Sequence, residues 1–272
     1  MPGSLRIISD YATWLERTEK DKYLPLLDEN QYLKNPTRSL SLNFIKLDAY
    51  SKAYPHFNLD ELCQQLKFDR HAIICLSTKN TNSVQSIRRM IMHLSEQEIQ
   101  NPIILVSEGE HENKDDALIQ YSIETGGLLL DGFGNGIMLL HQHENQQSLN
   151  PNLVNSISFG ILQATRTRIS KTEYISCPSC GRTLFDLQET TSRIRAVTNH
   201  LKGVKIAIMG CIVNGPGEMA DADFGYVGSG PGKITLYKGK EVIKRSVPEE
   251  IAVDELIVLL KENNAWIEVN KN

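Results

Sequence analysis

The chain has 272 residues, of which 40% are hydrophobic, and this is enough for one large domain or two ordinary ones. Its formal charge of −4 gives no reason to expect nucleic acid or an anionic membrane as a partner. No apolar run approaches the roughly 18 residues of a transmembrane helix, and the first residues lack the pattern of a signal peptide. The five cysteines are clustered and odd in number, which favours reduced thiols in a cytoplasmic protein.

The first two thirds of the chain alternate between short apolar runs and amphipathic stretches. Residues 1–40 are predicted to be partly helical, ending near Pro36. Strands are then predicted at 42–47, 72–76, 102–106 and 128–131, and helices at 60–66, 83–94, 115–125 and 155–164. Units of about thirty residues with this alternation indicate a parallel sheet with helices packed outside it. Four such units make about half of a β/α barrel of some 250 residues.

We therefore interpret residues 1–165 as a partial, β/α-barrel-like domain of the α/β class. Its glycine-rich stretch at 131–136 lacks the spacing of a phosphate-binding loop and is interpreted as an ordinary tight turn after the fourth strand. His141, His143 and Glu144 lie in a polar stretch that we interpret as a solvated loop, with a shared metal site as the less favoured alternative. Cys63 and Cys75 fall in or beside predicted core elements and are predicted to be packed thiols.

Residues 173–218 contain the candidate metal-binding residues. Cys177 and Cys180 are separated by two residues, a spacing that lets both thiolates reach one metal centre, and Cys211 follows a predicted buried strand at 204–210. The nearest acidic candidate for a fourth ligand is Glu218, across an Asn-Gly-Pro-Gly stretch that is predicted to be a tight loop. His200 is a rival ligand, but it lies near the far end of a predicted helix. Zinc would need a fourth sulfur or imidazole, whereas an iron–sulfur cluster can combine three cysteines with an exchangeable carboxylate.

Two motifs give these residues a family context. Cys-Pro-Ser-Cys-Gly-Arg-Thr at 177–183 and Gly-Cys-Ile-Val-Asn-Gly-Pro-Gly-Glu at 210–218 closely resemble the cluster-binding motifs of 4-hydroxy-3-methylbut-2-enyl diphosphate synthase. The resemblance extends from about residue 156 to 269. It looks like the version of plants and some bacteria, in which an extra domain lies between the substrate-binding barrel and the cluster domain.

The resemblance implies a [4Fe-4S] cluster bound by Cys177, Cys180, Cys211 and Glu218, with Glu218 as the ligand that yields during catalysis. It also implies that residues 166–272 form an α+β domain like half of a sulfite or nitrite reductase. The implied reaction of isoprenoid biosynthesis, in the methylerythritol phosphate pathway, is the reductive opening of 2-C-methyl-D-erythritol 2,4-cyclodiphosphate to 4-hydroxy-3-methylbut-2-enyl diphosphate. Flavodoxin or ferredoxin is the implied electron donor.

The same resemblance implies that the chain is a C-terminal fragment without the N-terminal substrate-binding barrel, so that it binds a cluster but does not complete catalysis alone. Asn214, Arg182, Arg168 and Arg166 are the candidate substrate contacts, because they lie beside the cysteines and offer an amide or cations to a diphosphate. The alternative roles are a turn residue for Asn214 and a solvated connector for the arginines.

Four further elements are predicted after the cysteine pair. An amphipathic helix spans 184–201, with its first amide groups directed at the cluster, and a loop contains Gly225, Gly228, Gly230 and Gly232. A hairpin joins 234–237 to 242–244, and a last helix begins at Pro248. Two other functions stay open, a zinc-binding interaction module and an electron-transfer protein of the ferredoxin type. The missing fourth sulfur disfavours both, and Glu218 is an unusual ligand for a centre that only passes electrons.

Overall fold

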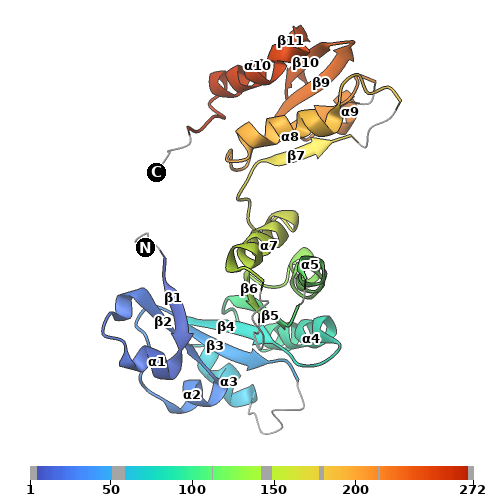
Figure 1. Ribbon diagram of the computed structural model, residues 1–272. Helices are drawn as coiled ribbons and strands as arrows, with labels where there is room; N and C mark the ends of the chain where they lie inside the picture. Colours follow the sequence, from blue (N-terminus) through green and yellow to red (C-terminus); the bar gives the residue numbers. More distant parts are fainter. Residues whose placement is uncertain are drawn as a thin grey trace. The chain divides into compact units, whose positions relative to one another are not determined.

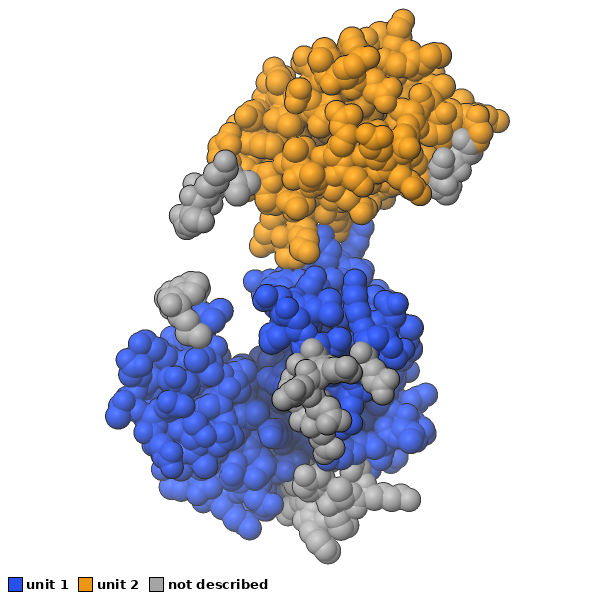
Figure 2. Space-filling view, in the orientation of Figure 1, with its two compact units in different colours: residues 1–168 blue, residues 169–272 orange. Residues whose placement is uncertain are grey.

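The computed structural model describes residues 5–50, 59–111, 113–141, 149–177, 181–213 and 215–268. The chain divides into two compact units, residues 1–168 and residues 169–272, which are coloured separately in Figure 2. None of the described helices combines the length and the apolar composition that crossing a bilayer requires.

Unit 1 contains a curled, six-stranded parallel sheet in the order β1-β2-β3-β4-β5-β6 (Figure 1). Its strands are β1 (Ile7–Asp10), β2 (Tyr23–Leu27), β3 (Asn43–Asp48), β4 (Ala72–Ser77), β5 (Ile103–Gly109) and β6 (Gly136–His141). The connecting segments contain α1 (Tyr11–Glu16), η1 (Lys20–Lys22), α2 (Glu29–Lys34), α3 (Leu59–Leu66), α4 (Ser83–Glu96), α5 (Lys114–Tyr121), the π-helical turn η2 (Ser122–Gly126), α6 (Gly127–Leu130) and α7 (Pro151–Ala164). Because each strand pairs with the next one in the sequence, the sheet has the topology of a partial β/α barrel.

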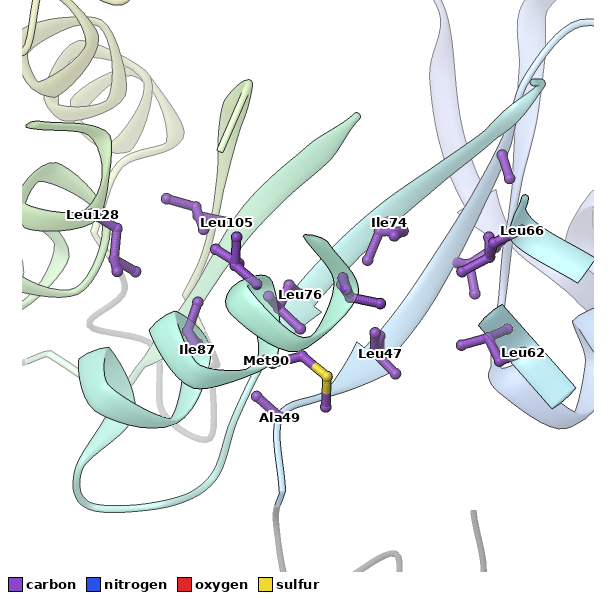
Figure 3. Close-up of a cluster of buried hydrophobic side chains, with 14 of the residues drawn as sticks. Leu47, Ala49, Leu62, Leu66, Ile74, Leu76, Ile87, Met90, Leu105 and Leu128 are labelled. Atoms are coloured by element: carbon purple, nitrogen blue, oxygen red, sulfur yellow. The ribbon is translucent and has the colours of Figure 1, made fainter. Parts of the chain in front are cut away.

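The main core of unit 1 lies between one face of this sheet and the helices. Figure 3 shows strand side chains such as Ile74 and Leu105 meeting Ile87 and Met90 of α4. The opposite face carries a smaller apolar cluster of Leu24, Phe44, Cys75 and Val106. Side chains alternate between the two faces of a strand, so both faces of these strands are apolar over much of their length.

Three of the four predicted strands of unit 1 are confirmed as β3, β4 and β5, and the four predicted helices correspond to α3, α4, α5 with η2, and α7. The prediction for 128–131 was wrong, because this segment continues the helix as α6 and buries Leu128 and Leu129 against the core. The glycine-rich turn therefore precedes β6 instead of following a strand, with φ values of 81° at Gly132 and 86° at Gly134. The helical prediction for residues 1–40 missed β1 and β2.

Unit 2 contains a five-stranded mixed sheet in the order β11-β10-β9-β8-β7. The three strands β7 (Glu173–Ser176), β8 (Lys205–Met209) and β9 (Phe224–Gly230) are parallel, and β10 (Lys233–Lys238) and β11 (Glu241–Pro248) continue the sheet antiparallel. Its helices are α8 (Leu187–Thr198), α9 (Gly215–Glu218) and α10 (Glu249–Glu262). The predicted strand at 204–210, the hairpin and the last helix are confirmed.

Two apolar clusters hold unit 2 together. The larger one joins α8 and α10 to the sheet through residues such as Ile194, Leu256 and Tyr226. A smaller cluster joins Met209 and Val227 to Met219, which follows α9. The predicted glycine loop was wrong, because β9 contains Gly225, Gly228 and Gly230, and only Gly232 lies in the turn that follows.

Candidate metal centre

Two cysteines of unit 2 leave neighbouring parallel strands at the same edge of the sheet. Cys177 directly follows β7, and Cys211 comes two residues after β8. The strands pair in parallel up to Ser176 opposite Ile208, and the Cys177 amide extends the pairing by donating to the Ile208 carbonyl at 3.4 Å. Since paired strands lie about 4.8 Å apart, residues far apart in the sequence meet where the backbone leaves the sheet.

The backbone of Gly210 links these two strand ends. Its N–H donates a hydrogen bond to the sulfur of Cys177, with an N–S distance of 3.2 Å. Its carbonyl accepts the N–H of Leu184 at 3.1 Å, which holds the segment after the Cys-x-x-Cys motif against the end of β8. An N–H directed at a sulfur stabilises negative charge there, and such hydrogen bonds tune iron–sulfur centres. The residue before Cys211 therefore sets the electrostatic environment of Cys177.

Close packing around Gly210 depends on the absence of side chains. A Cβ on Gly210 would lie 2.8 Å from side-chain atoms of Thr183. A Cβ on Gly228 would lie only 2.4 Å from the carbonyl oxygen of Gly210, which belongs to the backbone and cannot move alone. Gly228 therefore lets β9 approach the end of β8. The cluster of glycines was visible in the sequence, but this contact was not.

Glu218 ends the four-residue helix α9, and its side chain is exposed. The next residue, Met219, is 1% exposed and packs so closely on β9 that a Cβ on Gly225 would lie 2.9 Å from its sulfur. The tight loop predicted for the Asn-Gly-Pro-Gly stretch was wrong at residues 215–217, which are helical. Proline is tolerated in the first turn of a helix, because the N–H that it lacks would have no helical partner there.

The predicted set of four ligands is described only in part. Cys180 and Asn214 lie outside the described residues. Among the residues that the structure does describe, no three His, Cys, Asp or Glu side chains converge closely enough to hold a metal ion. The structure places Cys177 and Cys211 at one edge of the sheet, and the role of all four residues as ligands stays a prediction.

The described cysteines fall into two chemical classes. Cys63 and Cys75 are 3% and 2% exposed in the core of unit 1, as predicted for packed thiols. Burial raises the pKa of both, to about 12 for Cys75, so these thiols stay protonated and unreactive. Cys177 and Cys211 are free and partly exposed. Accessible thiols beside backbone donors fit the cysteine ligands of an iron–sulfur cluster.

The arginine candidates separate between the units. Arg182 is exposed in unit 2, next to the segment that packs on Gly210. Arg166 and Arg168 belong to unit 1, where they follow α7, and the Arg168 guanidinium lies 5.4 Å from the centre of the Phe159 ring. The structure therefore brings Arg182, and neither of the others, into the same unit as the cysteines.

The histidine candidates have other roles. His200 forms a 2.8 Å hydrogen bond between its Nε2 and the Ile267 carbonyl, and its ring meets Trp266 edge to face. His141 is the last residue of β6 and stacks on His111 with ring centres 6.0 Å apart, so the solvated-loop interpretation was wrong for this residue. His143 and Glu144 lie outside the described residues.

Helix α8 begins later than predicted, and a side chain caps its first turn. The helix begins at Leu187, and the carboxylate of Asp186 caps it by accepting the Glu189 N–H at 2.9 Å. The helical prediction from residue 184 was three residues too long at this end. The preceding segment, through Leu184, is what contacts the end of β8.

Comparisons with known proteins show what this chain is similar to. Residues 173–262 match the family described as "GcpE protein C-terminal domain". A protein of Parabacteroides distasonis is 44% identical over 267 residues, which cover 98% of this chain and 41% of the relative. A protein of Porphyromonas gingivalis is 49% identical over 209 residues, covering 77% of this chain and 35% of the relative. A protein of Leptospira interrogans is 56% identical over 165 residues, covering 61% of this chain and 24% of the relative.

These three relatives share one name, "4-hydroxy-3-methylbut-2-en-1-yl diphosphate synthase (flavodoxin)". The chain spans less than half of the length of each of them.

Proposed function

We propose a function on the premise that this chain belongs to the 4-hydroxy-3-methylbut-2-en-1-yl diphosphate synthase family: unit 2 binds the [4Fe-4S] cluster of the enzyme. The identity of 44% across 98% of the chain supports the premise. The reaction that we assign to the whole enzyme is the two-electron reduction of 2-C-methyl-D-erythritol 2,4-cyclodiphosphate to 4-hydroxy-3-methylbut-2-enyl diphosphate. This places the protein among the oxidoreductases of isoprenoid biosynthesis.

Cys177, Cys180, Cys211 and Glu218 are the proposed ligands. The observation that carries this assignment is the hydrogen bond from the Gly210 amide to the Cys177 sulfur, because it ties the two cysteine-bearing strand ends to each other. When bound, the cluster supplies single electrons and a Lewis-acidic iron for a leaving oxygen. The Gly210 N–H stabilises negative charge on the Cys177 sulfur.

Glu218 is suited to be the ligand that exchanges. Its side chain is exposed, whereas the neighbouring Met219 is anchored in the smaller core cluster of unit 2. The backbone at this position can therefore stay fixed while the carboxylate moves by rotation about its own side-chain bonds. Carboxylate is also a harder ligand than thiolate and is released more readily from a centre held by sulfur.

Substrate binding requires cations that these ligands do not supply. Arg182 is the proposed diphosphate contact of unit 2, because its exposed guanidinium lies in the segment beside Gly210 and can form paired hydrogen bonds with phosphate. Asn214 is proposed to donate a hydrogen bond to the substrate or to a ligand. Arg166 and Arg168 are weaker candidates after their placement in unit 1. The remaining contacts are proposed to come from a substrate-binding barrel such as the longer relatives have room for.

The electron donor is proposed to be flavodoxin, which the names of the relatives state, with ferredoxin as the alternative. Residues 1–165 are proposed to be the inserted barrel-like domain, and residues 166–272 the cluster domain, like half of a sulfite or nitrite reductase. The division between the compact units, at residues 168 and 169, supports this layout. A cytoplasmic location belongs to the same proposal, because the ligands must be reduced thiols.

Anaerobic reconstitution of the 272-residue chain with iron and sulfide tests the proposal. The expected product is brown, contains iron and acid-labile sulfide in equal amounts, and loses both in Cys177→Ser and Cys211→Ser. Cys63→Ser is the matched control, because it removes a thiol from the core of unit 1 and should leave the iron content unchanged. Stoichiometric zinc without sulfide would instead support the interaction module.

Two further measurements test the proposed enzymatic role. In the longer enzyme, which supplies the proposed substrate-binding barrel, a shift in the electron paramagnetic resonance spectrum of the reduced cluster on addition of the cyclodiphosphate would support the enzyme, and an unchanged spectrum would support electron transfer alone. Turnover by the isolated chain, supplied with a reductant and the cyclodiphosphate, would contradict the proposed need for a separate substrate-binding barrel.

A further inference from the structure

Unit 1 contains a cavity of about 790 Å³ at the carboxyl ends of β2, β3, β4 and β5. In parallel β/α folds this edge is where ligands bind, because the loops that follow the strands can vary without disturbing the sheet. The proposed reaction makes no use of this cavity. Its volume falls in the range of sites for small molecules.

The strands that line the cavity change from apolar to polar residues toward their carboxyl ends. On the face that carries the smaller apolar cluster, the early positions are apolar, as at Phe44 and Cys75. Continuing along the same strands in steps of two leads to Asp48 on β3 and Ser77 on β4, and both line the cavity. A polar layer above an apolar one is typical of a barrel mouth that binds a ligand.

Hydrogen bonds fix the side chain of Glu124, which lines the cavity. It lies in the π-helical turn η2, a rare conformation that is frequent at functional sites. One carboxylate oxygen accepts hydrogen bonds from Ser83 and Gln120, each at 3.3 Å, and the other accepts the hydroxyl of Ser107. Three donors on three different segments fix the position of this carboxylate.

A second carboxyl group of the wall, that of Glu29, is 8% exposed. Its Oε1 accepts the backbone N–H of Asp48 at 3.3 Å. Burial raises the pKa of Glu29 above its ordinary value, and the neighbouring carboxyl groups of Asp28 and Asp48 raise it further. A cationic ligand in the cavity would favour the ionised form of this group.

The charge of the wall indicates what kind of molecule fits. Among the described residues that line the cavity, six carboxyl side chains outnumber two lysines: Asp28, Glu29, Asp48, Glu108, Glu110 and Glu124 against Lys46 and Lys79. The carboxyl groups are distributed from the end of β2 to the end of β5, which is three strand spacings or roughly 14 Å. No three metal-ligating side chains of the described residues converge on one point, so the arrangement fits several separated positive charges better than one metal ion.

We propose that the cavity of unit 1 binds a linear diamine or polyamine, whose ammonium groups pair with Glu124 and with the other carboxylates spread along the carboxyl ends of the strands. Each primary ammonium group brings three N–H donors and each secondary one brings two, which match carboxylate acceptors in a way that a diphosphate cannot. This inference goes beyond the proposed function and does not depend on the cluster of unit 2.

Calorimetric titration of the 272-residue chain with spermidine tests the proposal. The expected result is saturable binding of about one molecule per chain that persists in moderate salt. Glu124→Gln should weaken it roughly tenfold, because a hydrogen bond to a charged group is replaced by one to a neutral amide. Lys79→Met should tighten it about two- to fivefold, because it removes a like charge from the wall.

Glu250→Gln is the matched control, since it removes one carboxylate from α10 of unit 2 and should leave the affinity unchanged. Lys79 is exposed, so its variant keeps the test valid even if Glu124→Gln fails to fold. Non-saturable heats, equal binding to all three variants, or displacement of spermidine by magnesium at matched ionic strength would each overturn the proposal, because each indicates ordinary ionic attraction to an acidic protein.

Discussion

The substitution Gly228→Ala tests the packing on which the cysteine pair depends. The new methyl carbon would lie 2.4 Å from the Gly210 carbonyl oxygen, and ordinary contact begins at 3.4 Å, so the two atoms must separate by about 1 Å. Moving Gly210 weakens both of its hydrogen bonds, from its amide to the Cys177 sulfur and from Leu184 to its carbonyl. Overpacking and two weakened hydrogen bonds together should cost about 2–4 kcal/mol of the stability of unit 2.

Gly230→Ala is the matched control in the same strand. A Cβ at Gly230 would have Lys233 as its nearest neighbour, at 3.9 Å, so the expected change is within about 0.5 kcal/mol. The assay is hydrogen exchange of β8 and β9 peptides in increasing urea, read by mass spectrometry, because this reports on unit 2 separately from unit 1. Iron content after anaerobic reconstitution is the second readout and should fall only in Gly228→Ala. Equal stability and equal iron content in the two variants would refute the argument.

Three further predictions concern Cys75, a buried thiol of unit 1, and Glu218, the proposed exchangeable ligand. Cys75→Ser should lower the stability of unit 1 by about 1–3 kcal/mol, because it buries a hydroxyl in an apolar cluster, and should leave the iron content of the chain unchanged. Urea unfolding measures the first effect, and iron analysis measures the second. Glu218→Cys in the longer enzyme should give an assembled cluster with little turnover, and full activity would exclude exchange of this ligand. Burial raises the pKa of Cys75 from 9.0 to about 12. The contribution of this thiol to stability is therefore complete below pH 9 and is lost as the pH rises toward 12. Cys75→Val should flatten this decline in urea unfolding measured between pH 8 and 11, and an unchanged slope would contradict it.

The strands of unit 1 show which patterns a sequence reveals. Strands β3, β4 and β5 are short and mostly apolar, and they recur at about thirty residues, so their lengths and spacing identified them. Strand β2 is also apolar, but it contains Pro25 and is surrounded by charged residues, and it was assigned to a helix. The strand prediction that includes Leu128–Leu130 was wrong for a different reason: a short apolar run fits a buried helix as well as a strand.

The candidate metal centre shows the same limit. The spacing of Cys177 and Cys180 and the motif around Cys211 identified the cysteines, but the meeting of the two strand ends depends on the β7–β8 pairing, which involves residues about thirty positions apart. Glycine in β9 was interpreted as a signal for a loop. Gly225 and Gly228 leave no room for a side chain, because Met219 and the Gly210 carbonyl come too close, and such tertiary contacts leave no periodic pattern.

The Mössbauer spectrum of the chain, reconstituted anaerobically with isotopically enriched iron, tests the central claim most directly. The account predicts about four irons per chain in a cubane cluster, one of them distinct because its protein ligand is an oxygen of Glu218 instead of a cysteine sulfur. Cys177→Ser should abolish the spectrum, and Glu218→Cys should remove the distinct iron. A spectrum of equivalent irons in the unaltered chain, or a chain that takes up no iron, would contradict the account.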